Sequence, residues 1–167
     1  MLLIILYAIW DIRKHQDLKM LIELFSIKLW GGRNLILKDY TKEMITNLID
    51  IIKECALQDK ITVSLEGSRV ENLQFIEEYN INEEKLVEIL SQLVKEDFCY
   101  GLKNMQDGVV HNDLYVFCPV KDLYNIKGEK ESVDIYMRFN MIQSDEEPYR
   151  MLVSLHKRNK PITYIFK

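Results

Sequence analysis

Alternating apolar and polar residues mark two strands near the C-terminal end of the sequence. Across residues 133–141 the odd-numbered positions are all apolar, whereas the even-numbered positions carry Asp, Tyr, Arg and Asn. Over residues 150–156, apolar residues again occupy the odd-numbered positions. A period of two residues is typical of a strand that turns one face to a core and the other to solvent. The charged segment 143–148 between the two strands predicts a hairpin loop.

A period near 3.6 residues precedes these strands and predicts three helices. Thr41 is a typical N-cap for the first helix, in which apolar residues recur at every third or fourth position. Ser68 and Glu71 fit the capping box that starts a second helix, and Asn80 suits the left-handed position that closes it. Asn82 is the expected N-cap of the third helix, which has acidic residues in its first turn.

Shorter segments complete the expected fold. Strands are expected over residues 60–65, 113–120 and 162–166, and polar loops are expected over residues 101–108 and 121–131. Helices followed by a meander of strands indicate an α+β domain, in which N-terminal helices pack on one face of a C-terminal antiparallel sheet.

Residues 1–40 are interpreted as an N-terminal extension of a domain that spans residues 41–167. Residues 12–30 show the apolar spacing of an amphipathic helix. The apolar run at residues 2–10 is shorter than the roughly 20 residues that cross a bilayer, and it lacks the basic start and cleavage site of a signal peptide. We therefore expect a cytoplasmic protein that does not contact a membrane. Two interpretations of the extension stay open, namely a natural start near Met44, or a helix that packs on the domain or on a partner.

Charge and cysteine content narrow the class of protein. The net charge is −4, and acidic residues clearly outnumber basic ones over residues 41–100, which argues against a winged-helix DNA reader in that segment. Every charged residue after Glu147 is basic, so the C-terminal strands are the segment that suits phosphate. The three cysteines show no paired spacing, so they indicate neither a disulfide framework nor a zinc site.

The predicted hairpin determines which side chains of its two strands lie opposite each other. Because both strands turn odd-numbered residues to the core, a slip of one residue would invert a face, so even-numbered residues pair with even-numbered ones. A loop from about residue 142 to 149 then gives paired residue numbers that sum to about 292. Tyr136 is then expected opposite His156, and Arg138 opposite Ser154, with Cβ atoms about 4.5–5.5 Å apart. One solvent-facing patch would therefore carry a phenol, an imidazole, a guanidinium and a hydroxyl.

These groups suit cleavage of an RNA backbone without a metal ion. The 2′-hydroxyl must lose a proton as it attacks phosphorus, the developing charge needs a cation, and the departing 5′-oxygen needs a proton. His156 can transfer protons near neutral pH, Arg138 can clamp phosphate oxygens, and Tyr136 can position the substrate or donate a second proton. The same Tyr–His pairing also occurs on solvated sheets that have no active site, so the pattern alone leaves both interpretations open.

Short motifs recur in a defined order over about residues 44–167. The helical part carries Asn72-Leu73, Tyr79-Asn80-Ile81, Ile89-Leu90-Ser91-Gln92-Leu93 and Glu96-Asp97-Phe98, and the strand part carries Leu114-Tyr115-Val116-Phe117, Asp134-Ile135-Tyr136-Met137-Arg138-Phe139, Val153-Ser154-Leu155-His156 and Pro161-Ile162-Thr163-Tyr164. In this order and spacing, the series resembles toxins of the MqsR family, which belong to type II toxin–antitoxin pairs.

The resemblance implies a RelE-like fold and an mRNA interferase that uses neither a metal nor a cofactor and is covered by a cognate antitoxin protein. Tyr136 matches the family's strand tyrosine, Arg138 matches a basic residue two positions on, and His156 matches a position held by Lys or His. Two residues depart from the pattern. Tyr100 stands where the family often has Lys, and Leu155 replaces an aromatic residue.

The sequence therefore leads to one functional hypothesis and one rival. The leading hypothesis is a toxin that cleaves mRNA, with His156, Tyr136 and Arg138 as catalytic residues. The expected RNA-binding residues are Tyr100, Lys103, Ser154, Lys157 and Arg158, and no metal ligand is expected. The rival is a non-catalytic module of the same fold that binds RNA or a partner protein.

Overall fold

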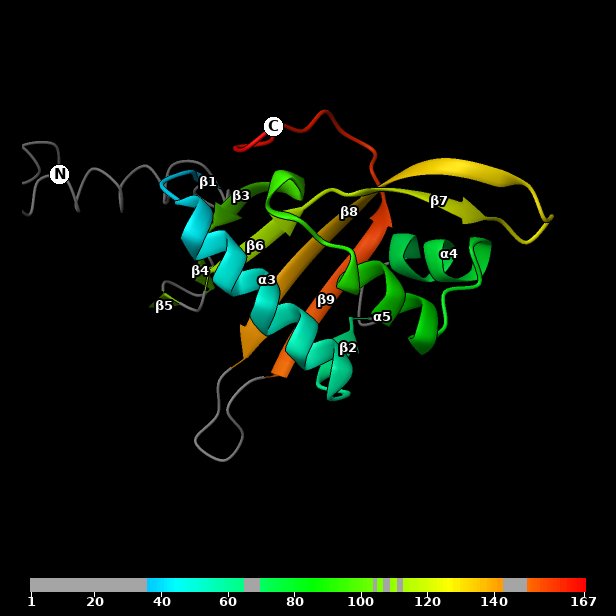
Figure 1. Cartoon of the computed structure of the whole chain (residues 1–167), viewed down its shortest axis with the longest axis horizontal. Helices are drawn as coiled ribbons and strands as arrows, with labels where there is room; N and C mark the ends of the chain where they lie inside the picture. Colours follow the sequence, from blue (N-terminus) through cyan, green and yellow to red (C-terminus); the bar gives the residue numbers. More distant parts are fainter. Residues whose placement is uncertain (1–35, 65–69, 104, 107–108, 111–112, 143–149) are drawn as a thin grey trace, which may run out of the picture. The chain divides into compact units, whose positions relative to one another are not determined.

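The computed structural model describes residues 36–64, 70–103, 105–106, 109–110, 113–142 and 150–167 (Figure 1). Three sequence predictions lie outside these ranges. They are the helix over residues 12–30, the Ser68 half of the capping box and the hairpin loop at residues 143–148.

Seven strands of the described residues form the main sheet. In spatial order these are β1 (Ile36–Leu37), β3 (Phe98–Leu102), β6 (Leu114–Phe117), β8 (Lys130–Ile142), β9 (Arg150–Lys157) and β2 (Ile61–Val63), and β7 (Val120–Tyr124) also pairs with β8. Neighbouring strands are antiparallel, except that β2 runs parallel to β9. The short strands β4 (Met105–Gln106) and β5 (Val109–Val110) form a separate hairpin.

The long strand β8 pairs with β6 and then with β7 along one edge. Phe117 of β6 and Val120 of β7 keep the same register against β8, so the two behave as one interrupted strand. Pro119 lies at the interruption because proline has no N–H to donate to a neighbouring strand. Its carbonyl still accepts a hydrogen bond from the backbone N–H of Ile135 at 2.9 Å. The strand expected over residues 113–120 is therefore confirmed, with a break near its end.

The loop expected over residues 121–131 is confirmed only at residues 125–129, because β7 fills its first part and β8 begins within it at Lys130. This end of the β7–β8 pair extends past the other strands as a two-stranded ribbon (Figure 1). Val120 and Tyr124 are both exposed on it. Most side chains of such a ribbon face solvent, so no alternation of apolar residues reveals its strands.

Apolar packing on the face of the sheet that carries Cys99 and Val116 explains two further errors of the sequence prediction. The loop expected over residues 101–108 is wrong, because the end of β3 and the whole of β4 lie within it. The strand expected over residues 162–166 is not formed. Cys99 of β3 and Val116 of β6 are buried on this face, and Tyr164 of the C-terminal segment packs against them. The C-terminal segment therefore covers the sheet instead of extending it. Strand β3 needs apolar residues on both faces, which removes the alternation that would identify it.

Three α-helices and a short 3₁₀ helix occupy the middle of the described chain. They are α3 (Lys42–Leu57), α4 (Val70–Glu78), α5 (Glu83–Ser91) and η2 (Lys95–Asp97). The Thr41 hydroxyl caps α3 by accepting from the Met44 N–H at 3.2 Å, and Asn82 caps α5 by accepting from the Lys85 N–H at 2.9 Å. Asn80 has a φ of 47°, in the left-handed region. The three helices predicted after Thr41 and the roles of Thr41, Asn80 and Asn82 are confirmed. No helix of the described residues is long and apolar enough to cross a bilayer.

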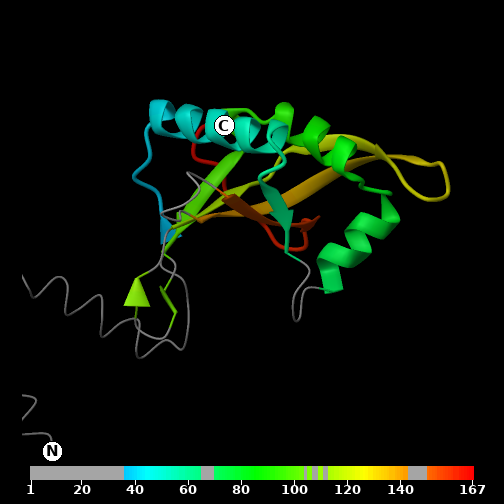
Figure 2. The same ribbon diagram turned by 90° about the horizontal axis from the view of Figure 1, so that it is seen from below.

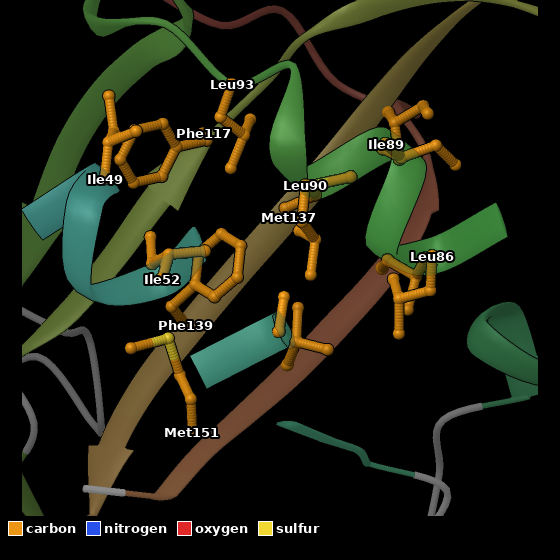
Figure 3. Packing of buried hydrophobic residues seen from close by; sticks show 14 of the residues in the cluster. Ile49, Ile52, Leu86, Ile89, Leu90, Leu93, Phe117, Met137, Phe139 and Met151 are labelled. Atoms are coloured by element: carbon orange, nitrogen blue, oxygen red, sulfur yellow. The ribbon is translucent and has the colours of Figure 1, made fainter. Parts of the chain in front are cut away.

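Helices α3 and α5 cover one face of the sheet (Figure 2), and the main core lies between them and the strands. Figure 3 shows Ile52 of α3 and Leu90 of α5 gathered with Met137 and Phe139 of β8. Helix α4 lies beside the second half of β9, past the end of β2 (Figure 1). The α+β class and the helix layer on one face are confirmed.

Residues just before α3 belong to the same unit of the chain, Ile36–Lys167. Strand β1 pairs with β3, and the Tyr40 ring packs edge-on against Phe98 with 5.1 Å between ring centroids. Gly101 lies so close to the Tyr40 ring that a Cβ there would displace the ring. A chain that began at Met44 would therefore lose a strand and an aromatic contact of the core.

Candidate functional site

The even-numbered residues of β8 and β9 lie on the face of the sheet opposite the helices. The predicted register is confirmed, because Tyr136 lies opposite His156 and Arg138 lies opposite Ser154. The odd-numbered residues between them are fully buried on the helix side. The hairpin therefore brings a phenol, an imidazole, a guanidinium and a hydroxyl onto one patch, as the alternation of the sequence predicts.

An open hollow of about 490 Å³ lies over this patch. The strands contribute Tyr100, Tyr136, Arg138, Ser154 and His156 to its lining, helix α4 contributes Glu71 and Asn72, and the segment after β9 contributes Arg158, Asn159, Lys160, Pro161 and Ile162. Four parts of the chain that are distant in sequence therefore line it, namely residues 71–72, residue 100, residues 136–138 and residues 154–162. Sequence reasoning identified the strand residues but none of those from α4.

His156 is held in position by two contacts. Its ring stacks on Tyr136, with 4.9 Å between ring centroids and an interplanar angle of 22°. Its Nδ1 lies 2.8 Å from the backbone carbonyl oxygen of Lys157. Since a carbonyl only accepts hydrogen bonds, this contact assigns the proton of the neutral ring to Nδ1. The lone pair of the neutral imidazole is then on Nε2, where it can accept a proton.

Two phenols meet at the floor of the hollow. Tyr136 and Tyr100 both line it, and each affects the pKa of the other. Burial raises the pKa of Tyr136 well above its usual value, the neighbouring Tyr100 adds to the rise, and Arg138 opposes it. Burial also raises the pKa of Tyr100, whereas the neighbouring Tyr136 acts in the opposite direction. Both phenols therefore keep their protons at neutral pH and act through hydrogen bonding and ring contact.

Arg138 supplies an unpaired positive charge to the hollow. It lies two residues after Tyr136 on β8 and is partly exposed. Within the part of the chain that the structure describes, no carboxylate forms an ion pair with it. A guanidinium presents a planar fork of donors that fits two oxygens of a phosphate. Arg138 is therefore available to bind an anionic substrate.

Glu71 is one of the site residues that sequence reasoning missed. Its Oε2 lies 3.7 Å from Nε2 of His156, and its Oε1 accepts a hydrogen bond from Asn159 Nδ2 at 2.9 Å. The sequence pattern marked Glu71 as part of a helix cap, which is a purely local feature. Its approach to β9 depends on how α4 packs beside the sheet, and no local pattern reports that.

Ser154 and Asn72 join α4 to the sheet beneath the hollow. The Ser154 hydroxyl donates to Asn72 Oδ1 at 3.1 Å, and Asn72 Nδ2 donates to the Ser64 carbonyl at 2.7 Å. Asn72 is 1% exposed and Ser154 is 7% exposed. The Ser154 hydroxyl is therefore engaged in a buried network, which suits a positioning role better than direct contact with RNA.

The three other cations expected to bind RNA are all paired. Lys157 points away from the hollow, where its Nζ donates to Tyr79 Oη at 3.0 Å and to a Glu131 oxygen at 3.2 Å. Arg158 lines the hollow but donates to Asp134 Oδ2 at 2.6 Å and 3.2 Å. Lys103 lies outside the hollow lining, and its Nζ is 3.6 Å from an Asp113 oxygen.

The described residues bring no three His, Cys, Asp or Glu side chains together as a metal site. All three cysteines are buried and free. Burial raises the pKa of the Cys99 thiol to about 12. Because the thiolate is the reactive form, Cys99 is a packing residue beneath the site and not a nucleophile.

Comparisons with known proteins do not assign the chain to a family. No family model matches it, and neither the search of curated proteins nor that of solved structures finds a match. The likeness to MqsR toxins is therefore a hypothesis that depends on the short sequence motifs. The function has to be argued from the residues of the hollow.

Proposed function

We propose that this chain is an endoribonuclease that cleaves RNA without a metal ion, with its active site in the hollow over β8 and β9. One observation carries the proposal. His156 is stacked on Tyr136 with Nδ1 on a backbone carbonyl. Arg138, which has no ion pair among the described residues, lines the same hollow. A fixed proton-transfer group beside a phosphate-binding cation is the arrangement that phosphodiester cleavage requires.

RNA carries its own nucleophile, which is why these few groups suffice. The ribose 2′-oxygen attacks the adjacent phosphorus, the bond from phosphorus to the 5′-oxygen breaks, and the products are a 2′,3′-cyclic phosphate and a 5′-hydroxyl end. His156 transfers protons in this reaction, and Arg138 binds the phosphate oxygens as their charge increases. Tyr136 keeps its proton because burial raises its pKa, so it orients His156 and the substrate by stacking and hydrogen bonding.

The expected substrate is single-stranded RNA. A DNA strand has no 2′-hydroxyl and would bind without being cut. Lys160, an exposed residue of the hollow lining, is a second candidate for contact with a flanking phosphate. Such contacts strengthen binding without selecting a sequence.

The motifs that resemble MqsR toxins support a cellular role for this activity. We extend the proposal to the toxin of a toxin–antitoxin pair, an mRNA interferase that acts in the cytoplasm and is held in check by an antitoxin protein. The test is to express the wild-type chain, His156→Ala and Thr62→Ala from an inducible promoter. Thr62 is exposed on β2 and outside the hollow, so Thr62→Ala serves as the control.

Wild type and Thr62→Ala are expected to arrest growth and deplete mRNA, whereas cells that express His156→Ala continue to grow. Equal arrest by all three proteins, at matched soluble levels, would show that His156 is not the catalytic group. Absence of arrest with the wild-type chain would remove the toxin role.

One observation favours a second candidate, a non-catalytic module that binds RNA or a partner protein. Glu71 places a carboxylate beside His156, and Asp134 pairs with Arg158, so the hollow is less positive than its basic residues suggest. Such a module would bind labelled RNA with an affinity that falls as salt rises, yet would leave the RNA intact. Binding without cutting, measured under the same conditions, would select this candidate over the nuclease.

A further inference from the structure

A carboxylate and an imidazole face each other at the rim of the hollow. Glu71 Oε2 lies 3.7 Å from His156 Nε2, and its second oxygen is held by Asn159 from the segment after β9. The Glu71 side chain is 58% exposed and that of His156 is 15% exposed. Glu71 is therefore open to a bound substrate on one side and adjacent to the imidazole on the other.

We propose that Glu71 is the general base and that protonated His156 is the general acid of the cleavage reaction. This inference rests on the proposed ribonuclease function and assigns its two proton transfers to separate groups. One imidazole cannot accept the 2′-hydroxyl proton and donate a different proton to the 5′-oxygen in the same step. A second proton-transfer group is therefore needed at the other reacting oxygen.

The other polar groups of the hollow are poorly suited to act as the base. The Tyr136 phenol keeps its proton because burial raises its pKa, and the Ser154 hydroxyl donates to buried Asn72. Arg138 keeps its proton throughout the pH range in which proteins are folded. Glu71 is left as the acceptor, with Oε1 oriented by Asn159 and Oε2 beside the imidazole.

The position of His156 suits a proton donor. Its Nδ1–H is engaged by the Lys157 carbonyl, so the proton that it can deliver into the hollow is the one on Nε2. When the ring is protonated, the Nε2–H lies beside the Glu71 carboxylate. A substrate phosphate bound to Arg138 would then lie within reach of both groups.

The proton balance closes without an external reagent. Glu71 takes the proton of the 2′-hydroxyl as the bond from the 2′-oxygen to phosphorus forms. His156 gives its Nε2 proton to the 5′-oxygen as that oxygen leaves. The site then holds a protonated carboxyl and a neutral imidazole, and transfer of one proton from Glu71 to His156 restores the starting state.

The experiment compares two leaving groups. Wild type, Glu71→Gln and His156→Ala are assayed from pH 4.5 to 9 on a dinucleoside phosphate and on a ribonucleoside 3′-(4-nitrophenyl) phosphate. Nitrophenolate departs without a proton, so it does not need the general acid. Glu77→Gln is the matched control, because Glu77 is an exposed glutamate of the same helix that lies outside the hollow. Thermal unfolding of each variant is measured to show that it is folded.

Glu71→Gln is expected to lower kcat by about 10²–10⁴-fold on both substrates and to remove the acidic limb of the pH profile. His156→Ala is expected to lose a similar factor on the dinucleoside phosphate and much less on the nitrophenyl ester. Glu77→Gln is expected to match wild type on both substrates.

Two results would overturn the assignment while leaving the ribonuclease function in place. One is a Glu71→Gln variant that keeps the wild-type rate and acidic limb. The other is a His156→Ala variant that loses the same factor on both substrates, since His156 would then be the base. A wild-type protein that cuts neither these substrates nor RNA would instead refute the ribonuclease function itself.

Discussion

The two faces of the β8–β9 hairpin differ in how completely they exclude water. Toward the helices, Met137 and Phe139 are fully buried among hydrocarbon side chains. Toward the hollow, their chain neighbours Tyr136 and Arg138 stay partly exposed and are polar. One strand thus supplies both a dry core and a polar site. The site residues are positioned by the packing of the core residues between them. Substitutions at odd-numbered positions should therefore lower stability, whereas substitutions at even-numbered positions should lower activity.

The largest expected effect is on the core side. Replacing Phe139 by Ala should lower the free energy of unfolding by about 3–5 kcal/mol, because it leaves a cavity between β8 and α3. Asn140→Ala, one residue further on the hollow side, should change it by less than about 0.5 kcal/mol. Urea unfolding followed by circular dichroism measures both values. Similar losses for the two variants would contradict the difference between the faces.

On the hollow side, Arg138→Gln should lower the rate of RNA cleavage by about 10²–10³-fold, because it removes the charge that binds the phosphate oxygens. Its free energy of unfolding should stay within about 0.5 kcal/mol of wild type, since Arg138 has no ion pair among the described residues. Lys127→Gln, on the exposed β7–β8 turn, is the control. A rate for Arg138→Gln equal to that of the control would remove Arg138 from the site.

Asn72 combines features of both faces of the hairpin, because it is buried like the core residues and polar like the residues of the hollow. Asn72→Ala leaves the Ser64 carbonyl and the Ser154 hydroxyl without their partner, which should cost about 1–3 kcal/mol of stability. Gln74→Ala, at an exposed position of the same helix, should be close to neutral. Urea midpoints of the two variants give the comparison. An Asn72→Ala variant as stable as Gln74→Ala would show that the network does not hold α4 to the sheet.

The smallest expected effect concerns alkaline pH. Burial raises the pKa of Tyr136 in the folded chain above its usual value of 10.0. The stability from its protonated form is therefore complete below pH 10 and is lost as pH rises past that value. Tyr136→Phe should show a shallower fall of the urea midpoint between pH 9 and 11.5 than wild type. Parallel curves would mean that the Tyr136 phenol ionises in the folded chain as easily as in the unfolded one.

The parts of the fold that were predicted correctly are those where one local pattern has one structural solution. The register of Tyr136 opposite His156 followed from the alternation together with the expected loop length, because a slip of one residue would have turned Met137 and Leu155 to solvent. The helix caps at Thr41 and Asn82 were equally local.

The parts that were missed depend on contacts between distant segments. Strand β3 is apolar on both faces, because the C-terminal segment covers one of them, so no alternation marks it. The approach of Glu71 to His156 depends on the packing of α4 beside β9. The pairing of Arg158 with Asp134 and of Lys157 with Glu131 likewise joins separate strands. Charge counted along the sequence therefore overstated how many cations are free to bind RNA.

The central claim, that the hollow cuts RNA through His156, is tested most directly with purified protein and an end-labelled RNA of mixed sequence in the presence of EDTA. We predict that wild type cuts the RNA to fragments ending in a 2′,3′-cyclic phosphate, and that His156→Ala, folded to the same extent, leaves it intact. RNA that stays whole with the wild-type protein, or is cut equally by both proteins, would contradict the account.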